Sequence, residues 1–292
     1  MVKLLYTREG AHSRPRILFH EDITGKEITS KLLAQIKTRK NIQIMEYTTM
    51  TDILISKGAC AGIEAETSDH KKIYIRADQT IFASGGIGGR YKHSTNFPHL
   101  TGDAIDIAKK HGIRLEHLDY VQVHPTTLYS KKPGRRFFDS ESVRGEGALL
   151  YDKNGNRFID ELLPRDVVTK AIQEQMKKDG TDHVWLSLEK IPKEIILSHF
   201  PNIYLHCLEE GYDATKEWIP VVPAQHYFMG GIWVDSDSHT SMPNLYAVGE
   251  TSCNGVHGKN RLASNPLLES LVFAKRAARE IMSEKQMNKV TA

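Results

Sequence analysis

PAQHYFMGG (residues 223–231), LYAVGE (245–250) and GVHGKNRLASNPLLESL (255–271) decide the fold of this 292-residue chain. The apolar run in the second stretch predicts a short buried strand that ends in a Gly-Glu turn. Pro266 predicts the first turn of a long helix, because its fixed φ suits a helix and its missing N–H is not needed there. A strand, a glycine-rich loop and a helix start are therefore expected.

This region also carries polar side chains that core packing does not require: His226, Glu250, His257 and Arg261. The free N–H groups and the dipole at a helix start favour a bound anion or an electron-rich ring. The sequence therefore predicts a binding site around the glycine-rich loop.

Composition excludes several classes of function. Charged residues make up 26% and hydrophobic residues 40% of the chain, as in a soluble globular protein. A net charge of +3 is too small to indicate a nucleic-acid-binding protein. No apolar run approaches the ~18 residues that span a bilayer, and the N-terminus lacks the apolar segment of a signal peptide. Cys60, Cys207 and Cys253 have no metal-binding spacing, so we expect free thiols, no metal and a cytoplasmic protein.

Local patterns predict the main elements. Helical spacing of apolar residues predicts a helix over residues 26–39, another from Arg165 onward and short helices within residues 181–222. Asn154 and Gly155 predict a hairpin turn. Four β-type runs separated by turn residues predict an antiparallel meander: 42–45, 52–56, 62–66 and 73–76.

Six motifs follow one another along the chain: TREGAHS (7–13), ASGG (83–86), QVHPT (122–126), SESVRGEGA (140–148), LPRDVV (163–168) and HGKNRLASNPLLE (257–269). In wording and order they resemble the flavoprotein subunit family of succinate dehydrogenase, fumarate reductase and L-aspartate oxidase. The last motif is most similar to the L-aspartate oxidase branch, which typically reads HGANRxASNSLLE. The resemblance covers nearly all of the chain.

The resemblance implies an α/β fold, with a partial FAD-binding domain of the Rossmann-like, glutathione-reductase type and an inserted α+β capping domain. We expect the FAD-binding domain in residues 1–117 and 226–292 and the capping domain in residues 118–225. The family's strand–GxGxxG–helix unit has no counterpart, because residues 85–89 follow the wrong strand, and its C-terminal helical domain is absent. The chain is therefore expected to be a fragment, or the partner of a separate N-terminal FAD-binding half, with poor FAD affinity alone.

The implied reaction is the FAD-dependent oxidation of L-aspartate to iminoaspartate, a step of NAD biosynthesis, with O₂ or fumarate as the electron acceptor. Two alternatives stay open. In the first, the chain is a fumarate reductase or succinate dehydrogenase flavoprotein that acts on fumarate or succinate. In the second, it is a non-catalytic fragment of such a protein.

A four-carbon dicarboxylate needs cationic and hydrogen-bonding groups at both ends. The resemblance assigns this role to four residues: His124, Ser140, His226 and Arg261. It also places Glu9 near the substrate amino group, where a carboxylate would favour aspartate over succinate. As alternatives, Glu9 is a surface charge and His124 is a structural histidine.

The resemblance makes Arg165 the group that transfers the substrate proton. The pKa of an arginine is above about 12, so the proton must be passed onward, and Glu141 and Arg144 are the implied relay. Their spacing places both on one side of a helical turn, and a structural ion pair is the alternative. An arginine just inside a helix start is electrostatically unfavourable, which indicates a function for Arg165.

The remaining assignments concern the cofactor, FAD. The apolar run before ASGG predicts a buried strand, and Ser84, Gly85 and Gly86 are expected to approach the flavin, since paired glycines permit close backbone contact. Asp103 is expected in the first turn of a helix, as part of its cap or as a cofactor contact. Further cofactor contacts are implied for Glu250, Asn265, Pro266 and Leu267. Because Pro266 stands where the family has serine, one N–H donor is lost.

Overall fold

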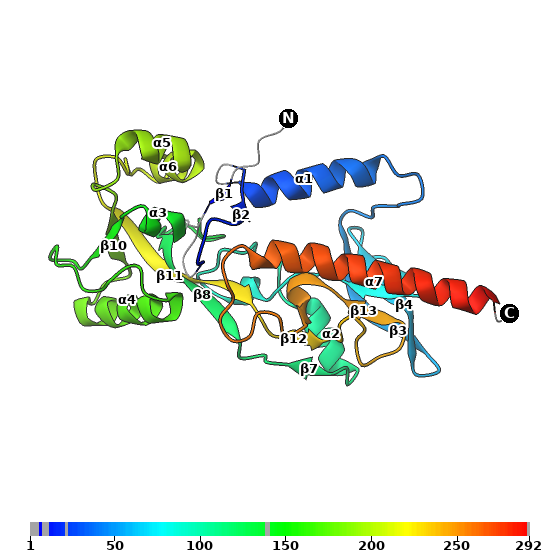
Figure 1. Ribbon diagram of the computed structural model, residues 1–292. Helices are drawn as coiled ribbons and strands as arrows, with labels where there is room; N and C mark the ends of the chain where they lie inside the picture. The colour runs from blue at the N-terminus through cyan, green and yellow to red at the C-terminus, as the bar shows by residue number, and fades with distance from the viewer. Residues whose placement is uncertain (1–5, 8–11, 21–22, 138–140, 291–292) are drawn as a thin grey trace, which may run out of the picture. The chain divides into compact units, whose positions relative to one another are not determined.

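The computed structural model describes residues 6–7, 12–20, 23–137 and 141–290 (Figure 1). The chain forms two compact units. Unit 1 consists of Met1–Lys40, Tyr91–Pro98 and Gln122–His226, and unit 2 of Asn41–Arg90, His99–Val121 and Tyr227–Ala292. The first forty residues thus group with the segment expected to form the capping domain, and the roles of the two units remain predictions. Within the described ranges, no helix has the length and apolar character needed to cross a membrane.

The centre of unit 1 is a four-stranded sheet in the order β8 (Val121–Leu128), β11 (Ile219–Phe228), β10 (Val184–Ser187) and β9 (Leu149–Tyr151). Strand β10 runs antiparallel to both of its neighbours, and Leu186 on β10 stands opposite Ile219 on β11 and Leu150 on β9. Residues opposite each other share one face of a sheet. These three side chains therefore form a continuous apolar row.

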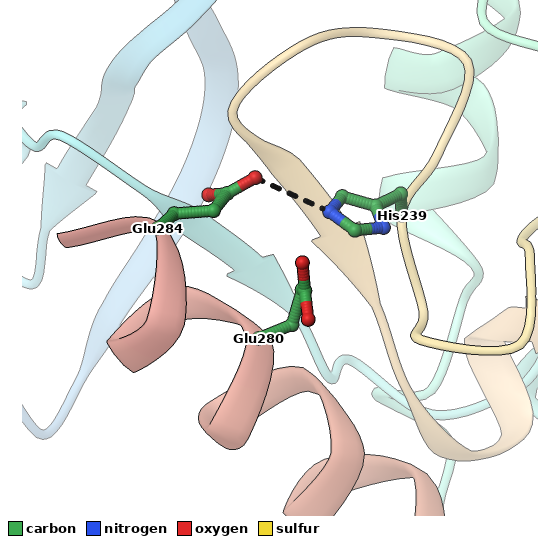
Figure 2. A group of neighbouring side chains, drawn as sticks. All are labelled: His239, Glu280 and Glu284. Atoms are coloured by element: carbon green, nitrogen blue, oxygen red, sulfur yellow. Dashed lines mark ion pairs between the residues drawn. The ribbon is translucent and has the colours of Figure 1, made fainter. Parts of the chain in front are cut away.

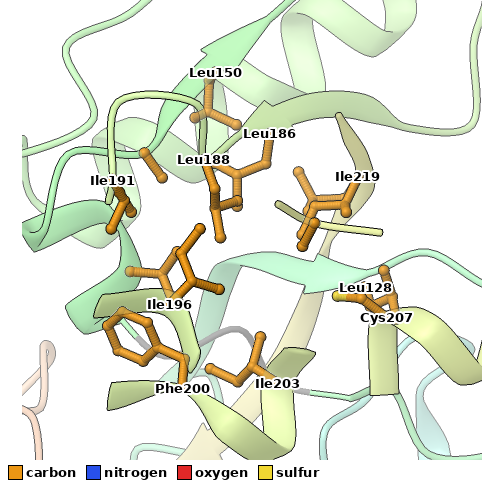
Figure 3. Packing of buried hydrophobic residues seen from close by; sticks show 14 of the residues in the cluster. Leu128, Leu150, Leu186, Leu188, Ile191, Ile196, Phe200, Ile203, Cys207 and Ile219 are labelled. Atoms are coloured by element: carbon orange, nitrogen blue, oxygen red, sulfur yellow. The ribbon is translucent and has the colours of Figure 1, made fainter. Parts of the chain in front are cut away.

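Three helices of unit 1 contribute to the same core: α4 (Arg165–Asp179), α5 (Lys193–His199) and α6 (Pro201–Glu209). Figure 3 shows Ile196 of α5 and Ile203 of α6 among the strand residues of this cluster. The short helices predicted within residues 181–222 are therefore confirmed as α5 and α6. The helical interpretation omitted strand β10, which lies in the same segment.

The rest of unit 1 comprises β1 (Tyr6–Thr7), which pairs with β2 (Ile17–Leu18), the helix α1 (Thr24–Lys37) and the short helix α3 (Glu141–Gly145). Helix α1 confirms the helix predicted for residues 26–39. None of its residues is buried. The amphipathic pattern therefore located the helix, although its apolar stripe is not part of a core.

Unit 2 is built on small sheets. Strands β3 (Thr48–Ser56), β4 (Ala59–Thr67) and β5 (Lys72–Arg76) form an antiparallel meander, and β6 (Thr80–Phe82) pairs in parallel with β13 (Leu245–Ala247). A further sheet has the order β14 (Ser252–Cys253), β12 (Gly231–Trp233) and β7 (Leu115–Glu116). The helical elements are η1 (Gly88–Arg90), α2 (Asp103–Lys110), η2 (Gly249–Thr251) and α7 (Asn265–Val290).

Helices pack on both faces of strand β13. Tyr246 clusters with Ala277 of α7, the long red helix in Figure 1. Leu245 and Ala247 cluster instead with residues of α2, among them Ala108. Successive strand residues point to opposite faces, so this division follows from the period of a strand. The parallel pair β6–β13 is therefore fixed between two helices.

Two predictions of local structure have different outcomes. The strand predicted at residues 42–45 is wrong, because these residues pair with no strand and their isoleucines are 45–46% exposed. The turn predicted at Asn154 and Gly155 is confirmed. The Asp152 carboxylate accepts the backbone N–H of Asn154 at 2.8 Å, and Gly155 has a φ of +81°. A side-chain acceptor of this kind stabilises a turn locally, whereas an apolar run needs a neighbouring strand.

Replacing Leu186 by alanine should lower the free energy of unfolding by about 2–5 kcal/mol, because it leaves a cavity within the apolar row. Urea denaturation followed by circular dichroism measures the loss. Leu197→Ala on α5 is the matched control, since Leu197 is 40% exposed and its truncation should change stability by only about 0.5 kcal/mol. Similar losses in the two variants would contradict this description of the core.

Candidate active site

Strands β8 and β11, helix α3 and the start of α4 contribute to a basic cluster in unit 1, formed by His124, His226, Arg144 and Arg165. The rings of His124 and His226 meet edge to face, with their centroids 5.6 Å apart. Arg165 is the first residue of α4 and donates from Nη1 to Oε1 of Gln122 at 3.1 Å. His124 is 0%, Arg144 2% and Arg165 7% exposed. The structure thus brings four of the predicted residues together within one unit.

His124 is uncharged in this cluster. Burial in the first place, and then the positive charges of Arg165, His226 and Arg144, hold the pKa of His124 well below its ordinary range. Its Nδ1 lies 2.8 Å from the carbonyl oxygen of Thr126 and 3.3 Å from the backbone nitrogen of Thr126, and the shorter contact favours a proton on Nδ1 that is donated to the carbonyl. His124 is therefore a neutral imidazole near pH 7, with its lone pair on Nε2.

Residues 94–96 fix the position of His226. Its Nδ1 lies 2.9 Å from Oγ1 of Thr95, and Asn96 donates from Nδ2 to the His226 carbonyl at 3.1 Å. Oε1 of the buried Gln225 accepts from Asn96 at 2.9 Å and from Ser94 at 2.7 Å. The Gln225 amide nitrogen has no hydrogen-bond partner in the described part of the chain. Sequence reasoning missed Ser94, Thr95 and Asn96 because they belong to no motif, and it assigned no role to Gln225 within the stretch 223–231.

The backbone of the predicted relay is present as the short helix α3. Arg144 donates from Nη1 to the carbonyl oxygen of Glu161 at 2.8 Å. The side chain of Glu141 lies outside the described residues, and so do Ser140 and Glu9. The roles of these three residues stay predictions.

In unit 2, the parallel strands β6 and β13 end side by side, and each runs into a glycine turn. Ser84 and Gly85 follow β6, whereas Gly249 and Glu250 follow β13. Gly249 has a φ of +67°, and a Cβ there would lie 3.2 Å from Oγ of Ser270 on α7, so this turn packs directly against the helix. Ligands of parallel sheets bind beyond the carboxyl ends of the strands. This edge of unit 2 is therefore a candidate cofactor site.

Glu250 is the central polar group of this edge. Its Oε1 accepts the backbone N–H of Phe228 at 2.9 Å, and a Cβ at Gly86 would lie 2.3 Å from the same oxygen, so a side chain at position 86 would displace the Glu250 carboxyl group. Burial raises the pKa of Glu250 to about 7, although the Phe228 hydrogen bond and the charge of Arg261 oppose this rise. Near neutral pH the carboxyl group can therefore either donate or accept a hydrogen bond.

A network around Glu269 fixes Arg261, also within unit 2. The Arg261 guanidinium lies 4.9 Å from the centroid of the Tyr227 ring, and the Tyr227 hydroxyl donates to Oε2 of Glu269 at 2.5 Å. Nε2 of His257 lies 2.8 Å from Oε2, and Asn254 donates to Oε1 at 2.6 Å. Burial acts to raise the pKa of Glu269, but these hydrogen bonds lower it below its usual value. Sequence reasoning missed Glu269, although an acidic residue inside the apolar LLESL run could have indicated it.

The other predicted cofactor residues lie at helix starts. Asp103 stands in the first turn of α2, as predicted, but its carboxylate accepts from Oγ1 of Thr101 at 2.6 Å, and no side chain caps the helix. Residues 265–267 form the first turn of α7 and are partly exposed. Three features of this edge fit a flavin nucleotide such as FAD. They are glycines that allow close backbone approach, a carboxyl group suited to a ribose or ribityl hydroxyl, and a helix start.

Comparison with known proteins agrees with this geometry. The FAD binding domain family matches residues 2–267 of the chain. The chain belongs to this family. The L-aspartate oxidase of Clostridium perfringens is 53% identical over 281 residues, which cover 96% of this chain and 64% of the relative. The L-aspartate oxidase of Clostridium acetobutylicum is 50% identical over 95% of this chain and 64% of the relative.

Solved structures of fumarate reductases share the fold. An Escherichia coli quinol fumarate reductase variant has a TM-score of 0.85 and 32% identity, and a quinol-fumarate reductase with menaquinol molecules has 0.87 and 33%. Each match covers 94% of this chain, but only 51% and 52% of the solved chains. The expected flavoprotein family and α/β fold class are confirmed. The chain spans less than two thirds of the length of these relatives.

The variant Glu250→Gln tests whether the pKa of the Glu250 carboxyl group is raised. Because its pKa is raised from 4.5 to about 7, Glu250 contributes stability that is complete below pH 4.5 and is lost as the pH rises through about 7. Glutamine cannot ionise, so the variant should gain stability relative to the wild type at pH 8 but not at pH 4.5. Thermal unfolding without flavin at both pH values measures this difference. Glu194→Gln, on the exposed side of α5, is the control; an equal pH response of all three proteins would disprove the shift.

Proposed function

We propose that this chain is the substrate-binding part of an L-aspartate oxidase, which oxidises L-aspartate to iminoaspartate with FAD. The basic cluster of unit 1 carries the proposal, because two buried arginines, one buried histidine and the half-buried His226 together suit a small dianion and not an apolar ligand. The high identity to the Clostridium perfringens enzyme favours aspartate as the substrate. The buried free cysteines favour a cytoplasmic location.

The proposed substrate ligands are those expected from the sequence: His124, Ser140, His226 and Arg261, with Glu9 at the amino group. Buried positive charge is unfavourable unless an anion accompanies it, so a dicarboxylate stabilises the cluster that binds it. Without a proton, Nε2 of His124 cannot donate a hydrogen bond to a carboxylate. Dicarboxylate binding at this residue therefore requires a proton on Nε2, which either proton uptake or the neutral tautomer that accepts the Thr126 N–H at Nδ1 provides.

The oxidation removes a hydride and a proton from the substrate. Bound FAD would supply the acceptor for the hydride, and Ser84, Gly85, Gly86 and Glu250 are the proposed cofactor contacts, with Asp103 and the first turn of α7. We assign the proton to Arg165, whose orientation the hydrogen bond to Gln122 fixes. Arg144 and Glu141 are the proposed route by which the proton leaves.

The test combines this chain with an N-terminal glycine-rich FAD-binding region from the Clostridium perfringens relative, either fused or as a separate half. The complex should bind flavin, seen as yellow absorbance, and should bleach when aspartate is added without oxygen. Arg165→Lys should keep the flavin but slow turnover by about 10²–10⁴-fold, because the proton acceptor is displaced. Arg76→Lys on β5 is the control. Flavin binding with unchanged turnover in Arg165→Lys would reject the role of Arg165, and absence of flavin in every combination would favour a non-catalytic fragment.

The fold similarity to quinol fumarate reductases favours one rival function, reduction of fumarate or oxidation of succinate. Glu9→Gln separates the two functions, since a carboxylate recognises the ammonium group that only aspartate has. The variant should lose roughly 10- to 100-fold in kcat/KM for aspartate, the size expected for a hydrogen bond between charged groups. Its fumarate reductase activity should change little. Equal losses with both substrates would count against aspartate as the native substrate.

A further inference from the structure

A group of potential metal ligands lies in unit 2, away from the residues assigned above. Glu280 and Glu284 stand one turn apart on α7, and His239 comes from the connection between β12 and β13 (Figure 2). One ligand atom of each residue lies within 4.8 Å of the other two. Nε2 of His239 and Oε1 of Glu284 are 3.6 Å apart. Two ligands of a tetrahedral zinc ion lie roughly 3.4 Å apart, so small side-chain rotations would complete the site.

Packing fixes the two elements that carry these ligands. His239 forms a β-bridge with Tyr246, which is 1% exposed and clusters with Ala277 and Ile281 of α7. Ala277 is 0% exposed. The distance between the β12–β13 connection and this part of α7 is therefore set by the core, and the ligands are brought together before any ion binds.

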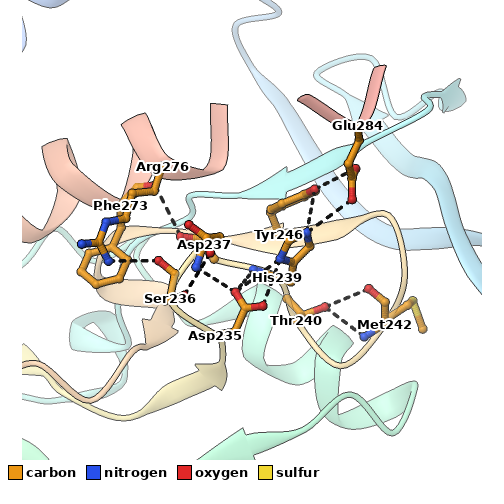
Figure 4. A network of polar contacts seen from close by, with 11 residues as sticks. Asp235, Ser236, Asp237, His239, Thr240, Met242, Tyr246, Phe273, Arg276 and Glu284 are labelled. Atoms are coloured by element: carbon orange, nitrogen blue, oxygen red, sulfur yellow. Dashed lines mark hydrogen bonds and ion pairs between the residues drawn. The ribbon is translucent and has the colours of Figure 1, made fainter. Parts of the chain in front are cut away.

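Asp235 orients the imidazole of His239, as Figure 4 shows. Oδ2 of Asp235 lies 3.1 Å from Nδ1 of His239, while Oδ1 accepts the backbone N–H groups of Asp237 and His239 at 2.9 Å each. This arrangement places the proton on Nδ1 and leaves the Nε2 lone pair directed toward the glutamates. A carboxylate behind the imidazole is the usual second partner of a metal-bound histidine.

The centre of this group contains more hydrogen-bond acceptor atoms than protons to share among them. The Tyr246 hydroxyl lies 3.1 Å from both Nε2 of His239 and Oε2 of Glu284, so its single proton serves only one of them. Gln79 donates to the same Glu284 oxygen at 3.2 Å. Among the described side chains, no lysine or arginine forms an ion pair with Glu280 or Glu284. Two glutamates one turn apart repel each other, so a cation between them would stabilise the helix.

We propose that His239, Glu280 and Glu284 bind one divalent transition-metal ion, best matched by Zn²⁺, which fastens α7 to the β12–β13 connection. One imidazole and two carboxylates, with water as the fourth ligand, suit zinc, whereas Mg²⁺ and Ca²⁺ prefer oxygen ligands alone. The expectation of no metal rested on the spacing of cysteines, and these ligands are distant in sequence and include no cysteine.

Calorimetric titration of the EDTA-treated full chain with Zn²⁺ tests the site. The wild type should bind one equivalent, and Glu280→Gln should weaken binding at least about tenfold. Glu66→Gln is the matched control, because Glu66 forms a pair with His70 at 2.7 Å without a third ligand, and its removal should leave Zn²⁺ affinity unchanged. Saturable Zn²⁺ binding that survives Glu280→Gln, or no saturable binding to the wild type, would overturn the proposal.

Thermal unfolding gives an independent test, because the melting temperatures of the wild type and Glu280→Gln should differ in opposite directions without and with Zn²⁺. Without metal, Glu280→Gln should unfold at the same or a higher temperature than the wild type, because one of two repelling charges is removed. Zn²⁺ should raise the melting temperature of the wild type and not that of Glu280→Gln, since only a ligand that prefers the folded state stabilises it. Co²⁺ should give the visible absorption of a tetrahedral site in the wild type alone. Identical Zn²⁺ and Co²⁺ responses of the two proteins would also overturn the proposal.

Discussion

The number of hydrogen-bond donors that reach a buried carboxyl group decides its charge, and this rule governs the polar part of unit 2. Three side chains donate to Glu269, and its pKa falls below the usual value despite burial. One backbone N–H reaches Glu250, and burial raises the pKa of that group to about 7. Two carboxyl groups of the same unit are thereby adapted to different tasks.

These tasks follow from the charges. Glu269, whose pKa is lowered, accepts the Tyr227 hydroxyl, and the Tyr227 ring in turn contacts the Arg261 guanidinium. A carboxyl group that is near its midpoint at neutral pH can adapt to a ligand that offers either a donor or an acceptor. In unit 1 the same effect acts on a base, because burial in the first place, and then the surrounding cations, hold the pKa of His124 well below its ordinary range. Each unit therefore holds one group whose pKa is shifted by burial in favour of the neutral form.

The sequence located residues that the structure brings together, such as His124 and Arg165, but not the environments of these residues. The motif around His124 and the helix start at Arg165 could be recognised locally, because both depend on neighbouring residues. The neutral state of His124 could not, since it depends first on burial and then on cations from distant segments, which only the folded unit provides. Thr95 was missed because it belongs to no motif, and the importance of Glu269 depends in part on its hydrogen bond with Tyr227, which is distant in sequence. The false strand at residues 42–45 shows the opposite error, because an apolar run becomes a strand only where another strand offers its edge.

Helix α7 separates two functions along its length. Asn265, at the proposed cofactor edge, and Glu280, in the proposed metal site, are fifteen residues apart, which corresponds to about 22 Å along a helix. An ion at Glu280 therefore cannot contact a ligand at the first turn. Apolar packing fixes the middle of α7 at Ala277, whereas Met282 is 63% exposed. A bound metal ion would hold α7 in place where this packing ends. It would affect the first turn only by keeping the helix straight and in position.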